Sequence, residues 1–364
     1  MAGSTYGTIF KITTWGESHG KGIGVVIDGC PAGLPLERKD IQLFLDRRKP
    51  GRDRYSTTRK EGDAVEILSG VFDGCTTGTP IALMIKNTDQ HSEDYSKISD
   101  YYRPGHADYT YSEKYGFRDY RGGGRSSGRE TAGRVAAGAI ASKLLGELGI
   151  TLTTYVRSIG PVEIEKFNPG EINRNPLNMP DLKAAARASE YLEKCLKNQD
   201  SSGGSVECIV QNLPAGIGDP VFEKLDARLA KALMSIGAVK AVEIGDGTKV
   251  SSATGSRNND AFTTDENGTI KKKTNHAGGV LGGISDGSDL VLRASFKPTP
   301  SIFSTQQTVN SKGENIDISI KGRHDPVIAP RAVVVVESMA AVTLIDSLMT
   351  GMSSRLSSLK KIWR

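Results

Sequence analysis

The stretch RGGGRSSGRETAGRVAAGAIASKLLGEL (residues 121–148) joins a glycine-rich loop to the clearest helix in the sequence. Ser127 and Glu130 have the S-x-x-E spacing of a capping box, and the alanine-rich run after them predicts a helix that continues to Leu148. The backbone N–H groups of the loop, the positive end of the helix and the nearby arginines favour a phosphate or carboxylate ligand. A plain helix cap with a flexible entry is the alternative. The loop matches neither the GK[ST] nucleotide motif nor the GxGxxG dinucleotide motif.

Outward from this helix, helices and strands are interspersed along the chain. Strands are expected at 8–14, 21–29, 64–71, 81–86, 205–211, 238–245 and 289–297. Further helices are expected at 35–48, at 181–197, from Asp219-Pro220 to about Ile236, and from about Pro330 to about residue 359. Strict strand–helix–strand alternation is missing, and hairpin signals such as Asn267-Gly268 are common, so the pattern predicts an α+β fold with antiparallel sheets packed against helices.

Residues 87–128 show no clear periodicity, and a connection of that length is usually functional or mobile. No Pro/Ser-rich linker divides the chain, so we expect a single domain over residues 1–364.

The overall composition is mildly basic, with a net charge of +5 over 364 residues. Arginines crowd residues 47–60 and 118–134, which favours an anionic small molecule because guanidinium groups bind phosphate and carboxylate in pairs of hydrogen bonds. The four cysteines have no metal or CxxC spacing, and no HExxH pattern occurs, so reduced thiols, a cytoplasmic location and no metal site are expected. We find no signal sequence and no apolar run of membrane-spanning length, so no membrane partner is expected.

The pentapeptide GESHG (residues 16–20) matches the Gly-x-Ser-x-Gly pattern of a hydrolase nucleophile elbow. An elbow requires a helix directly after the serine, whereas KGIGVVIDG predicts a strand. A serine hydrolase built on Ser18 is therefore the second interpretation. The first is a turn without bulky residues that presents Glu17, Ser18 and His19 to a ligand.

Four further motifs could contribute to a site. RPGHAD (103–108) presents His106 after a Pro-Gly turn, and GGVLGGISDGSD (278–289), KPTPS (297–301) and KGRHDPVIAPR (321–331) are glycine-rich or charged. Histidines, a carboxylate and many arginines suit acid–base chemistry on a phosphorylated or carboxylated molecule. YRGGGR is also typical of single-strand nucleic-acid binders, which is the third and weakest interpretation. We expect no nucleic-acid partner.

Taken in order, six segments resemble the signature motifs of the chorismate synthase family: GESHG, RPGHAD, YRGGGRSSGRET, NHAGGVLGGIS, KPTPS and GRHDP. The resemblance spans residues 16–326. It implies a helical layer sandwiched between antiparallel β-sheets, and a homotetramer. It also implies the last step of the shikimate pathway, the 1,4-anti elimination of phosphate from 5-enolpyruvylshikimate 3-phosphate to give chorismate. In that family reduced FMN is thought to lend electron density as phosphate leaves, with NADPH, if it takes part, as an indirect reductant.

The same resemblance implies catalytic roles. His19 resembles the histidine that protonates the leaving phosphate, and His106 the one beside the N1/C2 carbonyl side of the flavin. Asp325 matches an aspartate near flavin N5, and Ser18 and Ser127 match hydroxyls that assist the proton relay.

Binding residues follow in the same way. Flavin contacts are implied at Arg125, Ser126, Ser127, Gly237, Ala238, Gly282, Lys297, Pro298, Thr299, Pro300, Ser301 and Arg323. Substrate contacts are implied at Arg48, Arg54, Arg129 and Arg134; for Arg48 and Arg54 the nicotinamide is the other option. Two positions depart from the family pattern. Gly128 replaces an expected Ala, and Pro300 replaces an expected Ser, which puts that flavin contact in doubt.

Overall fold

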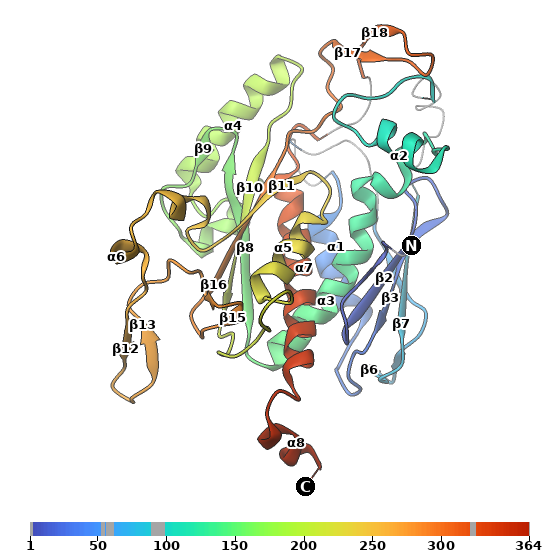
Figure 1. The fold of residues 1–364 in the computed structure, drawn as a ribbon. Helices are drawn as coiled ribbons and strands as arrows, with labels where there is room; N and C mark the ends of the chain where they lie inside the picture. Colours follow the sequence, from blue (N-terminus) through green and yellow to red (C-terminus); the bar gives the residue numbers. More distant parts are fainter. Residues whose placement is uncertain (1–2, 52–54, 56–61, 89–98, 321–324, 364) are drawn as a thin grey trace.

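The computed structural model describes residues 3–51, 55, 62–88, 99–320 and 325–363. Two five-stranded antiparallel sheets enclose a layer of helices, as Figure 1 shows, which confirms the α+β class and the layered arrangement. The first sheet has the order β1 (Thr5–Tyr6), β2 (Lys11–Gly16), β3 (Gly22–Asp28), β7 (Ile81–Lys86) and β4 (Val65–Ile67). The second has the order β11 (Val239–Ile244), β16 (Leu290–Phe296), β10 (Gly204–Gln211), β8 (Thr151–Ile159) and β9 (Val162–Glu163).

Four helices form the layer between the sheets: α1 (Arg38–Arg48), α3 (Thr131–Glu147), α5 (Leu225–Met234) and α7 (Ala329–Gly351). The remaining helices are α2 (Asp108–Tyr115), α4 (Leu182–Lys197), α6 (Gly255–Asn258) and α8 (Leu356–Trp363). Short hairpins decorate the body: β5 (Val71–Phe72) with β6 (Cys75–Thr76), β12 (Phe262–Thr264) with β13 (Ile270–Lys272), β14 (Val280–Leu281) with β15 (Ile284–Ser285), and β17 (Gln306–Val309) with β18 (Asn315–Ile318). The Asn267-Gly268 hairpin is thus confirmed.

The core lies between the helical layer and the sheets. Strand β16 alternates buried and half-buried residues, and Leu290, Leu292, Ala294 and Phe296 point inward, as the period of a strand with one covered face requires. Helix α7 is buried almost all round because it contacts both α3 and the second sheet.

This burial corrects one expectation. Helix α7 is long and apolar enough to cross a membrane, contrary to the prediction that no segment is, but 89% of its most apolar window is buried inside the protein. A core helix of a layered protein meets the same criteria of length and composition.

Helices α3 and α7 touch at a glycine. A Cβ added at Gly138 of α3 would lie 2.1 Å from Ser338 Cβ on α7, closer than any real contact. On another face of α3, a Cβ at Gly133 would meet Gly24 O of β3 at 3.1 Å. The glycines predicted within this helix therefore let it pack closely against its neighbours.

Several predicted boundaries were wrong. Residues 8–10 do not belong to a strand, because the N–H groups of Thr8, Ile9 and Phe10 all donate to the carboxylate of Asp346 and curl the chain there. The helix expected from Asp219 begins at Leu225, whose N–H donates to Gly283 O on the β14–β15 hairpin.

The expected capping box is also different. Ser127 Oγ accepts from Arg129 N at 3.3 Å, the first turn is a 3₁₀ helix (Gly128–Glu130), and Glu130 pairs with Arg134 instead of reaching back. The final helix is interrupted after Gly351 and resumes as α8, and α2 was not predicted.

We predict that Gly138→Ala destabilises the protein by about 1–3 kcal/mol, because the added methyl group has no space against α7. Gly146→Ala on the same helix is the matched control: a Cβ there meets nothing within 4 Å, so it should be neutral or stabilising by up to about 1 kcal/mol. Thermal or urea unfolding measures both. Equal stability of the two variants would contradict the close α3–α7 contact.

Candidate functional site

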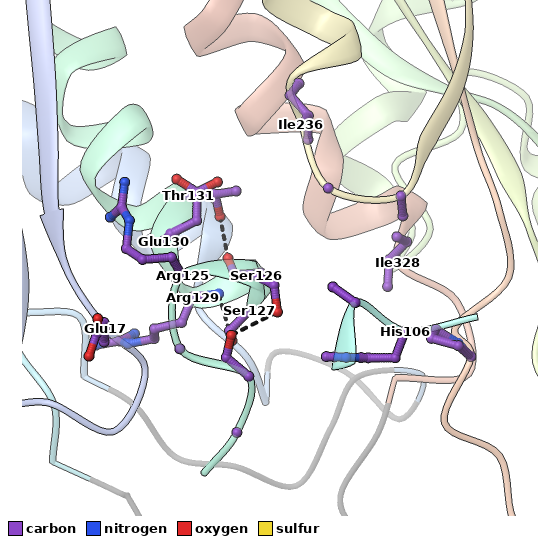
Figure 2. A pocket seen from close by; sticks show the side chains of 18 of the residues that line it. Glu17, His106, Arg125, Ser126, Ser127, Arg129, Glu130, Thr131, Ile236 and Ile328 are labelled. Atoms are coloured by element: carbon purple, nitrogen blue, oxygen red, sulfur yellow. Dashed lines mark hydrogen bonds between the residues drawn. The ribbon is translucent and has the colours of Figure 1, made fainter. Parts of the chain in front are cut away.

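A pocket of about 1460 Å³ opens at one end of the helical layer. The first turns of α3 and α7, the last residue of α1 and residues 235–238 after α5 reach it, together with the loop before α3 and the segment 297–301. Figure 2 shows the segment Arg125–Thr131 on one side of the pocket and His106, Ile236 and Ile328 on the other. Two helix N-termini at one pocket favour anionic groups there.

The glycine loop separates the two candidate histidines. A Cβ at Gly122 would lie 2.4 Å from the His19 ring, and a Cβ at Gly123 would lie 3.0 Å from Cε1 of His106. Because neighbouring Cα atoms are about 3.8 Å apart, the two imidazoles lie within roughly 12 Å of each other. Ser18 lies at the same loop, since its Oγ donates to Gly122 O at 3.3 Å. His106 lines the pocket, whereas His19 is buried directly beneath Gly122.

Charged groups surround His106. Its Nδ1 lies 3.0 Å from Asp108 Oδ1 and 3.0 Å from Arg103 Nη2. Arg103 donates to both oxygens of Asp108, at 2.7 and 2.8 Å, and Arg118 Nη1 lies 3.1 Å from Oδ1. Burial works against the charged carboxylate, but the hydrogen bonds from Arg103 outweigh it and hold the pKa of Asp108 far below its usual value. The His106 ring is therefore held beside a carboxylate that stays ionised.

A buried carboxylate joins two of the arginines predicted to bind substrate. Asp63 Oδ2 accepts from Arg48 Nη1 at 2.7 Å, and Oδ1 accepts from Arg129 Nη1. Burial opposes ionisation here too, but the charges of Arg48 and Arg129 prevail and lower the pKa of Asp63. Both arginines line the pocket.

Other charged side chains link the elements around the pocket. Arg125 donates to Gly16 O and Thr14 Oγ1 at the end of β2, and Arg134 Nη1 donates to Ser235 Oγ at 2.6 Å after α5. Asp325 Oδ2 pairs with Arg331 Nη1 at 2.5 Å at the start of α7.

Most of the predicted site residues meet in this pocket. Those that line it are Arg48, His106, Arg125, Ser126, Ser127, Arg129, Arg134, Gly237, Ala238, Lys297, Thr299, Pro300, Ser301 and Asp325. Ser18 and His19 lie just behind it. Pro298 does not line it, and Gly282 lies apart in the β14–β15 turn. Arg54 and Arg323 fall outside the described residues.

Sequence reasoning gave no role to three charged residues of the site. Asp63 carried no motif signal, because its importance depends on partners distant in the sequence. Arg331 stands at the end of the quoted KGRHDPVIAPR segment, but its bond to Arg48 O could not be predicted from that segment. Asp108 stands in the quoted RPGHAD segment, two residues after His106. That spacing was the available signal.

The pocket fits a large anionic cofactor together with a second ligand. Its volume exceeds the roughly 300–1,000 Å³ usual for one small molecule. Thr299 Oγ1 is buried in its wall with no hydrogen-bond partner among the described residues, so a polar group is needed there. The missing side chains of Gly122 and Gly123 leave room for the imidazoles of His19 and His106, and the serine hydroxyls and arginines nearby suit a phosphate.

Comparison with known proteins agrees with these features. The family model described as chorismate synthase matches residues 10–349. The chain belongs to the chorismate synthase family. A chorismate synthase from Lachnoclostridium phytofermentans is 64% identical over 366 residues and 100% of both chains. One from Agathobacter rectalis is 64% identical over 358 residues, covering 98% of this chain and 97% of the relative.

A solved structure supports the same conclusion. A crystal structure of chorismate synthase matches with a TM-score of 0.76 and 31% identity, over 98% of this chain and 97% of the other. Membership of the chorismate synthase family makes the chain an enzyme, a lyase of aromatic amino-acid biosynthesis.

We predict that Gly122→Ala lowers the rate of chorismate formation about 100-fold, because its methyl group must displace the His19 ring and a shift of that size disturbs catalysis. Gly124→Ala is the control: its φ of +53° carries the same backbone strain as the +63° of Gly122, but its Cβ would meet nothing within 4 Å. Equal losses in the two variants would show that strain, and not the contact with His19, is responsible.

Proposed function

We propose that this enzyme converts 5-enolpyruvylshikimate 3-phosphate to chorismate by 1,4-anti elimination of phosphate, with reduced FMN as cofactor. The observation that carries the proposal is a glycine loop between two histidines, His106 in the pocket and His19 just behind it, beside a cluster of arginines. Family membership supports it, since the relatives are named for making chorismate.

In this proposal the flavin is held by the loop before α3 and by residues 237–238 and 297–301. Ser126, Ser127 and Thr299 offer hydroxyls, and Lys297 offers a cation. Bound reduced FMN would lend electron density to the substrate as phosphate leaves, which a side chain cannot do.

Pro300, which replaces the Ser of the family pattern, packs against another loop of the chain. A Cβ at Gly105 would lie 3.2 Å from Pro300 Cβ, and Lys297 Nζ donates to Gly105 O. Pro300 therefore packs the 297–301 segment against the loop that carries His106. The departure at Gly128 is neutral for packing, since a Cβ there would meet nothing within 4 Å.

The substrate carries two carboxylates and a phosphate, and Arg48, Arg129 and Arg134 are proposed to bind them. All three line the pocket near the positive end of α3. Their guanidinium groups hold anions in a fixed geometry, which positions the leaving phosphate.

Protons are proposed to move at two ends of the glycine loop. His106 faces the pocket, with Nδ1 fixed beside Asp108. His19 exchanges its proton with the leaving phosphate past Gly122, where no side chain intervenes, and Ser18 and Ser127 assist. Asp325, paired with Arg331, serves as the relay near the flavin.

The hydrolase interpretation loses its structural basis. The residues after GESHG form strand β3, as the sequence predicted, and not the helix that follows a nucleophile elbow. Ser18 Oγ is engaged with Gly122 O. A homotetramer, a cytoplasmic location and an external source of reduced flavin stay predictions from the family resemblance.

The reaction is tested by anaerobic assay of the purified protein with chemically reduced FMN and substrate. We expect equal amounts of chorismate and inorganic phosphate, and no turnover with oxidised FMN alone. NADPH and FMN without a reductase should also fail. Turnover without any flavin, or ester hydrolysis that Ser18→Ala abolishes, would contradict the proposal.

His106→Ala and His19→Ala should each lower turnover about 100- to 10,000-fold, the usual range for a positioned acid–base group. The measurement is single-turnover phosphate release at saturating reduced FMN, with unfolding curves to confirm the fold. A double variant that turns over at the wild-type rate would rule out both roles.

A further inference from the structure

One carboxylate in the site has no assigned role and is completely buried. The Asp63 side chain has 0% exposure, and each of its two oxygens accepts from a different arginine. Arg48 ends α1, Arg129 stands just before α3, and Asp63 comes from the segment that leads into β4. A single side chain therefore connects three separate elements through two arginines that line the pocket.

The two guanidinium groups are also fixed from other sides. Arg48 Nε donates to Thr131 Oγ1 at 3.1 Å and Nη2 to Gly128 O at 3.3 Å. Arg129 Nε donates to Asn87 Oδ1 at 2.9 Å. Arg129 Nη2 donates to Lys86 O at 3.3 Å, so with Asp63 in place each guanidinium has at least three protein contacts, which sets the orientation of its plane.

The charges explain why a carboxylate is required there. Arg331, whose Nε donates to Arg48 O at 3.2 Å, adds a third cation near the pair. Burial, together with Arg331 and Arg129, lowers the pKa of Arg48 to about 10, while the charge of Asp63 opposes that shift. Without Asp63, like charges would face each other out of water and move apart.

The backbone conformation of Asp63 also indicates a functional role. Its φ is +44°, a left-handed conformation that residues other than glycine rarely adopt, although Asp tolerates it better than most. Such conformations persist where the surroundings hold them and are common at functional sites. Here the strained residue is the one that carries the bridging carboxylate.

We propose that Asp63 is a positioning residue, whose buried carboxylate holds Arg48 and Arg129 in the orientation that binds an anionic group of the substrate. This inference rests on the proposed function, because it assumes that the two arginines meet the substrate. Substitution of Asp63 has two effects on substrate affinity, and they act in opposite directions. Removing a negative charge near the pocket should by itself strengthen anion binding, whereas losing the arrangement of the arginines should weaken it.

The test measures substrate binding by calorimetry in the full-length protein, without flavin, so that turnover does not enter. Asp63→Asn should weaken substrate binding by about tenfold or more, although it removes a negative charge that repels the anionic substrate. Asp63→Glu keeps the charge and displaces the carboxylate by one methylene, so it should fold and weaken binding by about three- to tenfold.

The matched control is Asp73→Asn, which makes the same charge change at another Asp with a positive φ, +48°. Asp73 is exposed in the β5–β6 turn and does not line the pocket, so substrate affinity should stay at the wild-type value. In the steady-state assay with reduced FMN, Asp63→Glu should raise KM while kcat changes less than about twofold. If Asp63 only stabilised the fold, the Asp63→Glu substitution would lower the unfolding temperature and leave KM unchanged.

The outcomes are distinct. Wild-type affinity in Asp63→Glu, or in a folded Asp63→Asn, overturns the positioning role and leaves the proposed function standing. If Asp63→Asn does not fold, Asp63→Glu decides alone. No substrate binding by the wild-type protein would instead overturn the proposed function.

Discussion

The contact between Gly138 and Ser338 is the constraint on which the arrangement of the site depends. A side chain larger than hydrogen at residue 138 would hold α3 and α7 apart. Because the helices touch, their first turns reach the same end of the helical layer, and the positive ends of both point to one pocket. The two sheets then close around this pair, and each brings one loop with it: GESHG after β2 and KPTPS after β16.

Buried carboxylates organise the cations around this pocket. Asp63 joins Arg48 to Arg129, and Asp108 joins Arg103 to the loop of His106. Taking such groups out of water is costly, and the cost is offset only where every charge has well-placed partners. The result is a set of cations already oriented before a ligand arrives, which lowers the reorganisation needed for catalysis.

The sequence was enough to predict the α+β class and the position of α3, because local patterns determine these features: a glycine loop before an alanine-rich helix, and alternating apolar residues in β16. The family resemblance supplied the site residues, and most of those line the pocket. Other features depend on distant partners. Asp346 delays the start of the strand expected at residues 8–14, the β14–β15 hairpin delays α5, and Asp63 gains its importance from Arg48 and Arg129. Gly282, assigned by resemblance, lies outside the pocket of this chain.

The most direct test of the account is a crystal structure of the protein with FMN and 5-enolpyruvylshikimate 3-phosphate. The account predicts the flavin ring against residues 122–127 and 297–301, and the anionic groups of the substrate at Arg48, Arg129 and Arg134. A flavin bound elsewhere, for example in the smaller hollow lined by Lys249, Arg257 and His276, with the main pocket empty, would contradict it.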